Sequence, residues 1–223
     1  MIVIAGTIGA GKTSLATLLA KHLNSKAFYE SVDNNPVLPY FYKDPQKYAF
    51  LLQIYFLNKR LAQLKAADKI QNSVIDRSIF EDSLLFHLNA DLGRATDTEV
   101  AVYDSLLENM LQELPQQSYH KKPGLLIHIN ISFDTMLKRI AKRNRPYEQI
   151  AQDPSLYHYY QELNHRYSKW YQDYDESPKL QINGDQLDFV NDDLAHKRVL
   201  NIIDQKISQL HQITNIASGN QRR

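Results

Sequence analysis

The segment that most constrains this chain lies near its start, where an apolar run leads into a glycine-rich loop. The loop, Gly6-Thr7-Ile8-Gly9-Ala10-Gly11-Lys12-Thr13, matches the pattern G-x-x-x-x-G-K-[ST] in full. Residues 2–5 before it are apolar, and residues 14–23 after it have helical spacing. A strand, a tight glycine turn and a helix in this order predict backbone N–H groups that cradle phosphates.

Two side chains at the end of this loop extend the prediction. Lys12 has the reach to contact the β- and γ-phosphates of a nucleoside triphosphate, and the hydroxyl of Thr13 suits Mg²⁺. The pattern alone does not fix the reaction, and a glycine turn that binds nothing is the alternative. The residues that we expect to bind ATP here are Gly6, Thr7, Ile8, Gly9, Ala10, Gly11, Lys12, Thr13 and Ser14.

Short apolar runs and helical stretches alternate along the chain. The runs are residues 2–5, 27–29, 74–75, 125–131 and 179–182, and helical spacing is clearest in 12–23 and 48–67. This alternation predicts an α/β fold with a five-stranded parallel sheet flanked by helices. Active sites of such sheets lie beyond the carboxyl ends of the strands.

Composition narrows the class of partner. The 223 residues suffice for one domain, which we expect to span residues 1–216, with a frayed polar tail at 217–223. A net charge of +1 argues against nucleic acid as a partner. Cysteine is absent, which excludes disulfides and zinc thiolates, and no apolar stretch is long enough for a bilayer. We expect a cytoplasmic protein that acts on small molecules and has no membrane partner.

Glu30 directly follows the second apolar run. A carboxylate beside the transferred phosphate can accept the proton of an attacking hydroxyl. Taken alone, such a residue is more often a surface carboxylate.

Asp76, Arg77 and Ser78 follow the third apolar run. Asp76 can bind Mg²⁺ directly or through water, and Arg77 can hold a phosphate or orient a hydroxyl. Ser78, Asp82 and Phe86 recur every four residues and so share one helix face. Two interpretations stay open: one wall of a pocket, or an N-cap at Ser78 followed by a half-exposed helix.

Arginines gather after the fourth apolar run. Arg139 and Arg143 are four residues apart on one helix face, and Arg145 and Glu148 follow around Pro146. The run fits either a solvated basic face or a lid that closes over a triphosphate.

Taken together, these motifs resemble the deoxyribonucleoside kinase family, most of all the bacterial deoxyadenosine/deoxyguanosine kinases of lactobacilli and mycoplasmas. The resemblance runs from Ile2 to about Ile213. It implies that Glu30 is the catalytic base, that Arg77 lies near the 5′-hydroxyl, and that Asp76 and Thr13 are on the magnesium side. The residues that it implies for the nucleoside are Glu30, Val32, Tyr42, Gln53, Arg60, Arg77, Asp82, Phe86 and Glu148, with Arg139, Arg143 and Arg145 as the lid.

Helical spacing agrees with this resemblance. Gln53 and Arg60 are seven residues apart and fall on one helix face, where burial in a core would leave their polar groups without partners. The face that carries Asp82 and Phe86 would form the opposite wall. We also include Asp185, after the fifth apolar run, among the residues that bind ATP.

The resulting expectation is an ATP- and Mg²⁺-dependent kinase that phosphorylates the 5′-hydroxyl of deoxyadenosine or deoxyguanosine, with Glu30, Arg77 and Lys12 as catalytic residues. A deoxycytidine kinase or a broad-specificity deoxynucleoside kinase is the alternative. A nucleoside monophosphate kinase of the thymidylate kinase type and a non-catalytic nucleotide-binding module are weaker ones. The resemblance also implies a homodimer or a heterodimer with a paralogous subunit.

Overall fold

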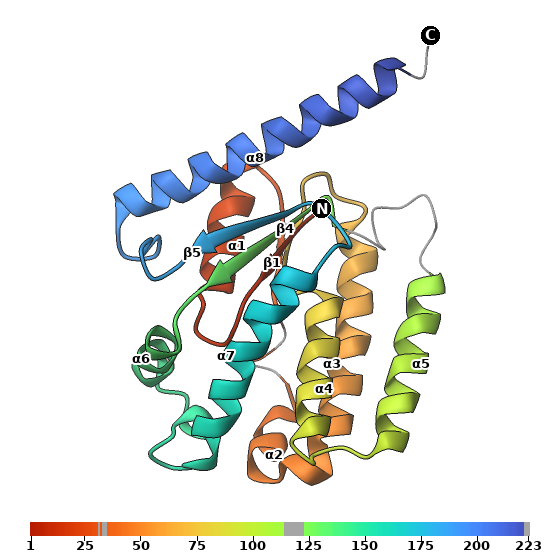
Figure 1. Ribbon diagram of the computed structural model, residues 1–223, viewed down its shortest axis with the longest axis vertical. Coiled ribbons are helices and arrows are strands. Elements are labelled where there is room, and N and C mark those ends of the chain that lie inside the picture. The colour runs from red at the N-terminus through yellow and green to blue at the C-terminus, as the bar shows by residue number, and fades with distance from the viewer. Residues whose placement is uncertain (31, 33–34, 114–122, 221–223) are drawn as a thin grey trace.

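Five parallel strands in the order β2-β3-β1-β4-β5 form the centre of the fold (Figure 1). The computed structural model describes residues 1–30, 32, 35–113 and 123–220. The strands are β1 Ile2–Ala5, β2 Ala27–Phe28, β3 Val74–Asp76, β4 Leu125–Asn130 and β5 Lys179–Asn183. The helices are α1 Lys12–His22, α2 Leu38–Lys43, α3 Pro45–Ala67, α4 Ile79–Asp91, α5 Asp97–Glu113, α6 Phe133–Arg143, the 3-10 turn η1 Pro146–Glu148, α7 Ser155–Asp173 and α8 Asp193–Asn220.

The predicted fold class and strands are confirmed, with ends that differ by one residue. Helix α3 begins before its apolar spacing does, at Pro45, because Asp44 caps it by accepting a hydrogen bond from the Lys47 N–H at 3.2 Å. Ser78 is likewise an N-cap, as one of the two interpretations predicted, and it forms a capping box with Glu81.

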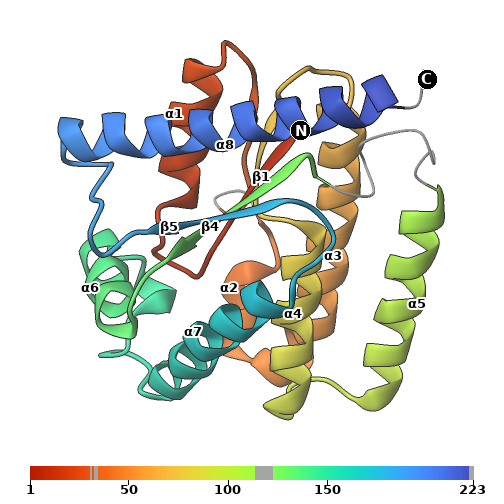
Figure 2. The ribbon, with the colours of Figure 1, turned by 45° about the horizontal axis from the view of Figure 1, so that its top comes forward.

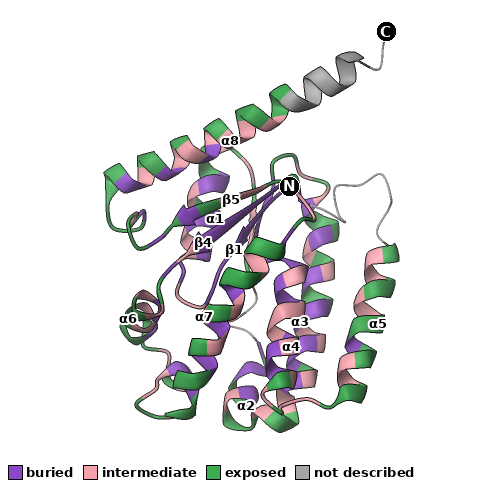
Figure 3. Cartoon of the chain, in the orientation of Figure 1, coloured by how far each residue is buried: buried purple, intermediate pink, exposed green. Residues whose placement is uncertain are grey.

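Helices cover both faces of the sheet, with α1 and α8 on one side and α3, α4, α5 and α7 on the other (Figure 2). Strand β1 contributes alternate residues to a core on each face of the sheet: Val3 and Ala5 join the core that contains Leu57 of α3 and Tyr103 of α5. Ile2 and Ile4 join the core that contains Leu15 of α1 and Ile203 of α8. Strands β1 and β3 and nearly all of β4 are buried, whereas β2 is half-buried and the outer faces of the surrounding helices carry exposed residues (Figure 3).

The strand register brings the predicted site residues to one edge. Ile4 of β1 pairs with Asp76 of β3, and Phe28 of β2 pairs with Ile75. Because all strands run in the same direction, the residues that follow β1, β2 and β3 leave the sheet together. The glycine loop, Glu30 and Arg77 therefore meet at the carboxyl edge, as predicted.

Two expectations about the chain as a whole can be compared with this fold. Over the described residues, every helix falls short of the length or the apolar character that a membrane crossing requires. Helix α8 continues to Asn220, residues 221–223 lie outside the described part, and the frayed tail stays a prediction.

Candidate active site

The phosphate loop, residues 6–13, connects β1 to α1 through backbone that only glycine adopts readily. Gly6 has φ +148°, and a Cβ atom there would lie 2.8 Å from the Ile129 carbonyl oxygen. Gly11, with φ +97°, precedes the first residue of α1. The loop thus leads directly into a helix N-terminus, where unpaired N–H groups favour an anion.

Lys12 folds back over this loop. Its Nζ donates hydrogen bonds of 2.9 Å to the carbonyl oxygens of both Gly6 and Thr7. Burial and, after it, the positive charge of Arg77 lower the pKa of Lys12 to about 8, against the opposing effects of Asp76, Glu30 and Glu81. A phosphate bound nearby would therefore raise the pKa of Lys12 and keep its side chain protonated.

Thr13 and Asp76 form the side of the site suited to a divalent cation. The Thr13 hydroxyl donates to Asp76 Oδ2 at 2.5 Å, while Oδ1 of this buried carboxylate has no hydrogen-bond partner among the described residues. One hydroxyl and one free carboxylate oxygen fit Mg²⁺, which keeps several waters and completes its shell with phosphate oxygens. The described residues hold no group of three or more acids and histidines that could bind a metal by themselves.

Glu30 faces two arginines. Its Oε1 lies 2.7 Å from Arg77 Nε and 3.6 Å from Arg60 Nη2, and its side chain is 13 % exposed. Burial alone would raise the pKa of Glu30, but Arg77, Arg60 and Lys12 together lower it below the ordinary value. The carboxylate is thus ionised, partly accessible and next to the phosphate loop.

Arg77 has an unusual backbone as well as a central position. Its φ of +77° is uncommon for a residue with a side chain, and its N–H donates to the Ile4 carbonyl at 2.9 Å. Such a conformation costs on the order of 1–3 kcal/mol and recurs at functional sites. Here it turns the guanidinium from the end of β3 towards Glu30.

Arg60 and Asp82 form a buried ion pair behind Glu30. Arg60 Nε donates to Asp82 Oδ2 at 2.9 Å, and its Nη1 donates to the Asp76 carbonyl at 2.8 Å. Burial raises the pKa of Asp82 despite the attraction of Arg60. These two residues, both expected at the nucleoside, therefore pair with each other and support the wall of the cavity from behind rather than lining it.

A cavity of about 840 Å³ runs from the phosphate loop to α3 and α4. It brings together the loop, Glu30, Arg77 and the arginines of α6. The predicted residues that line it are Ile8, Gly9, Gly11, Lys12, Thr13, Ser14, Glu30, Val32, Tyr42, Gln53, Asp76, Arg77, Arg139, Arg143, Arg145 and Glu148.

Gln53 is the polar group on the α3 wall of this cavity. It is buried, and its Oε1 has no hydrogen-bond partner within the described structure. Phe86, expected on the opposite wall, is fully buried and packs on Tyr103 with ring centroids 4.7 Å apart. Leu85 and Asn89, at neighbouring positions around α4, line the cavity instead. The half-exposed helix considered for this stretch is wrong for Asp82 and Phe86, because both side chains are fully buried: Asp82 pairs with Arg60, and Phe86 packs in the core that includes residues of α3 and α5.

The arginines after β4 contact both ends of the cavity. Arg139 donates to the Ala10 carbonyl at 3.1 Å and to the Gly184 carbonyl at 2.8 Å, so it lies on the phosphate loop. Arg143 pairs with Glu148, and Arg145 Nη1 lies 3.5 Å from Glu148 Oε1. This segment thus joins the phosphate loop to Glu148, one of the residues expected at the nucleoside.

Known proteins similar to this chain identify the family to which the site belongs. Residues 2–208 match the deoxynucleoside kinase family. The chain belongs to the deoxynucleoside kinase family. It is 53 % identical over 210 residues to a deoxyguanosine kinase of Lactobacillus johnsonii, covering 94 % of this chain and 93 % of that protein. It is 54 % identical over 210 residues to a deoxyadenosine kinase of Lactobacillus acidophilus, covering 94 % and 97 %.

A solved structure supports the same assignment. Deoxyadenosine kinase from M. mycoides with bound dATP superposes with a TM-score of 0.75 at 29 % identity, covering 91 % of this chain and 98 % of that one. The predicted family and the prediction of an enzyme are confirmed. The roles of individual residues in this deoxynucleoside kinase stay predictions.

The predicted residues and the residues that line the kinase cavity differ in both directions. Asp185, expected at ATP, is exposed, accepts from the Ser132 N–H at 3.0 Å and lies outside the lining, whereas Asp188 and Asn191 line it. Gly6, Thr7 and Ala10 also lie outside the lining, beneath the loop surface. The lining residues that were missed are Thr17, Tyr29, Leu38, Phe41, Leu52, Phe56, Leu85, Asn89, Lys142, Tyr159, Asp188, Val190 and Asn191.

Proposed function

We propose that this deoxynucleoside kinase transfers the γ-phosphoryl group of ATP to the 5′-hydroxyl of deoxyadenosine or deoxyguanosine. The observation that carries the proposal is the ionised Glu30 carboxylate, 2.7 Å from Arg77 and in one cavity with the phosphate loop. A nucleoside kinase needs such a base beside a bound triphosphate. A monophosphate kinase needs a site for an acceptor phosphate instead.

The reaction follows from this arrangement. The 5′-oxygen attacks the γ-phosphorus, the bond from that phosphorus to the bridging oxygen of ADP breaks, and the hydroxyl proton passes to Glu30. Because Arg77 lowers the pKa of Glu30, the carboxylate is a weak base that takes the proton late in the transition state. Lys12, Arg139 and Arg143 would stabilise the charge on the moving group.

Mg²⁺ fits the same cavity. Thr13 Oγ1 and Oδ1 of Asp76, which has no hydrogen-bond partner among the described residues, would hold it directly or through water. When bound, the cation neutralises phosphate charge and aligns the γ-phosphoryl group with the acceptor.

The base and the sugar have separate candidate partners. Gln53 offers a buried amide whose oxygen has no hydrogen-bond partner in the described part of the chain, and an amide can pair with two positions on a purine edge. The names of the two Lactobacillus relatives support purines. Tyr42 and Glu148 would hold the 3′-hydroxyl beside Val32. Because ribose and deoxyribose both carry this hydroxyl, the Tyr42–Glu148 pair does not explain discrimination between the two sugars at the 2′ position. Deoxycytidine and broad-specificity kinases remain the alternative, because the family resemblance implies an Arg–Asp couple like Arg60–Asp82 in deoxycytidine kinases as well as in purine kinases.

One assay tests the proposal. ATP consumption is measured with the four deoxynucleosides, their ribose forms and the four deoxynucleoside monophosphates. Turnover fastest with deoxyadenosine or deoxyguanosine is the expected result. Preference for deoxycytidine would overturn the purine assignment, preference for a monophosphate would overturn the acceptor, and tight ATP binding without turnover would favour a non-catalytic module.

Two further predictions concern the protein in the cell. We expect a homodimer or a heterodimer with a paralogous subunit, in the cytoplasm. Light scattering of the purified chain, alone and after co-expression with a paralogue, measures the oligomeric state. Fluorescence microscopy of a tagged chain measures the second.

A further inference from the structure

We propose that Tyr167 and Glu81 are positioning residues that hold the Arg77 guanidinium against Glu30 and tie it to the phosphate loop. Neither residue lines the cavity, and no sequence pattern singled them out. The inference rests on the proposed role of Glu30 as the base, because it concerns how that base is kept in place.

Glu81 is a fully buried acid in the first turn of α4. Its Oε1 accepts a hydrogen bond from the Gly6 N–H at 3.1 Å, and its Oε2 accepts one from the Ser78 N–H at 2.7 Å. One carboxylate therefore joins the first glycine of the phosphate loop to the residue after Arg77. An ordinary capping box needs only the contact with Ser78. The bond to Gly6, 75 positions away in the sequence, goes beyond that requirement.

Tyr167 connects this carboxylate to Arg77. Arg77 Nη1 donates to the Tyr167 hydroxyl oxygen at 2.6 Å, and the same hydroxyl donates to Glu81 Oε1 at 2.9 Å. The hydroxyl accepts one hydrogen bond and donates the other, so the two bonds run in one direction, from Arg77 through Tyr167 to Glu81. Hydrogen bonds that involve a charged group are the stronger kind.

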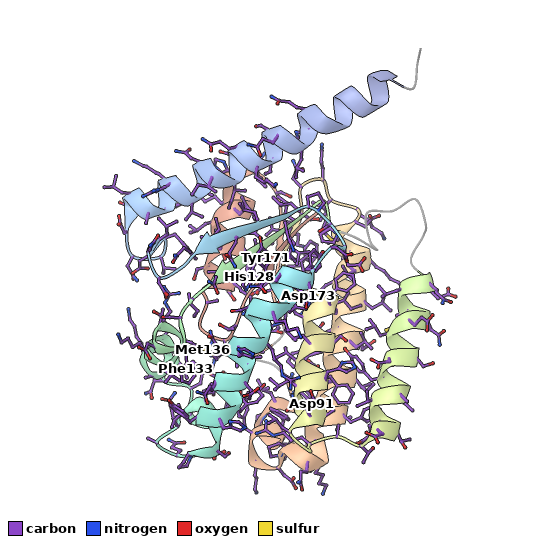
Figure 4. All side chains as sticks on the ribbon, viewed as in Figure 1. Asp91, His128, Phe133, Met136, Tyr171 and Asp173 are labelled. Atoms are coloured by element: carbon purple, nitrogen blue, oxygen red, sulfur yellow. The ribbon has the colours of Figure 1, made fainter. Side chains whose placement is uncertain are left out.

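The Tyr167 ring is held by aromatic neighbours rather than by charges. His128 of β4 stacks parallel to it with ring centroids 6.1 Å apart, and Trp170 packs edge-on at 5.9 Å. Burial, and then Lys12, lower the pKa of His128 to about 4, so the imidazole adds no charge near neutral pH. Figure 4 shows His128 next to Tyr171, one turn further along α7, where that helix meets β4; their centroids are 4.8 Å apart.

The hydroxyl also separates two opposite charges. Arg77 Nη1 lies 3.7 Å from Glu81 Oε1, with the Tyr167 oxygen bonded to both. Without that oxygen, Arg77 and Glu81 would draw together, and Arg77 Nε would move away from Glu30. The charged groups that then act on Glu30 are Arg60 and Lys12. Losing the nearest cation would leave burial as the main influence on the Glu30 carboxyl and raise its pKa.

Tyr167→Phe is the decisive variant, because it removes one oxygen and keeps the aromatic packing. Glu81→Gln is less suited, since its amide would turn a donor towards the N–H of Gly6 or Ser78 in a buried place, and the protein could fail to fold. Tyr171→Phe is the matched control. It removes a hydroxyl from the same helix, and neither its ring contact with His128 nor that with Lys179 depends on the hydroxyl.

Two measurements are made on wild type, Tyr167→Phe and Tyr171→Phe. The first is the pKa of Glu30 from carbon-13 NMR of its side-chain carboxylate, assigned by loss of the signal in Glu30→Gln. The second is the split between kcat and the KM for ATP. In Tyr167→Phe we expect a higher Glu30 pKa and a kcat lower by about ten- to a hundredfold, with the KM for ATP nearly unchanged. Tyr171→Phe should match wild type.

The outcomes separate the inference from the proposed function. A Glu30 pKa in Tyr167→Phe equal to that of wild type would overturn the positioning role, whatever the turnover. Equal changes in both tyrosine variants would assign the effect to general loosening of α7 and would also overturn it. Failure of the wild type to phosphorylate any deoxynucleoside would overturn the proposed function, while the NMR measurement still decides the inference.

Discussion

Glu30 Oε1 lies 2.7 Å from Arg77 Nε and 3.6 Å from Arg60 Nη2, so the ends of β2 and β3 meet helix α3 at one carboxylate. This arrangement keeps the acid ionised inside a partly closed cavity. It also weakens the acid as a base, because two cations stabilise its charged form. The balance suits phosphoryl transfer, in which the acceptor proton needs to leave only when the new bond is well advanced.

ATP affinity should fall as the pH rises above about 8. In the free protein, Lys12 loses its proton as the pH rises through its pKa of about 8. Bound phosphates would raise this pKa, so that Lys12 stays protonated in the complex. Binding therefore takes up a proton just above that pH, and calorimetry in two buffers of different ionisation enthalpy measures the uptake. Lys12→Arg, which stays protonated, should bind without uptake. Equal uptake in both proteins would assign the proton to another group.

Gln53→Leu should weaken use of purine deoxynucleosides and leave ATP use nearly intact. The change removes an amide of similar size from the α3 wall and with it about 1–3 kcal/mol of base recognition. The KM for deoxyadenosine or deoxyguanosine should rise about ten- to a hundredfold. Gln172→Leu on the exposed side of α7 is the control. A rise in the KM for ATP by the same factor would show that Gln53 supports the fold rather than the base.

Asp82→Ala should lower purine use more than ATP affinity and also destabilise the protein. It leaves Arg60 buried without its 2.9 Å partner, at a cost of about 3–5 kcal/mol. Arg60 would then be drawn towards Glu30 and change the wall behind the base. Kinetics for both substrates and thermal unfolding measure the two effects. Equal losses for nucleoside and ATP would make Asp82 a structural residue alone.

The parts of the site that depend on local order were predictable from the sequence. The glycine loop needs its residues at fixed spacing, and β1 and α1 follow from the residues on either side. The end of each strand fixed the positions of Glu30 and Asp76, since parallel strands share one carboxyl edge. Ser78 was predictable as a cap because its signal lies within four residues.

The sequence did not reveal how each helix is turned about its own axis, nor which residues distant in the sequence come into contact. Phe86 and Leu85 are neighbours on α4, and spacing alone did not reveal which of them faces the cavity; the packing of Phe86 on Tyr103 of α5 decides it. Tyr167 and Glu81 are 86 positions apart, and only the fold brings them to Arg77. Asp185 and Asp188 lie in one loop after β5, where no periodicity distinguishes them.

The central claim is that Glu30 accepts the proton of the attacking hydroxyl. Its most direct test is kcat of Glu30→Gln, which keeps the size of the side chain and removes the base, compared with Glu162→Gln on α7, outside the cavity lining. With both variants folded as judged by circular dichroism, kcat of Glu30→Gln should fall by about a hundredfold or more, and Glu162→Gln should match wild type. Near-wild-type turnover by folded Glu30→Gln would contradict the account.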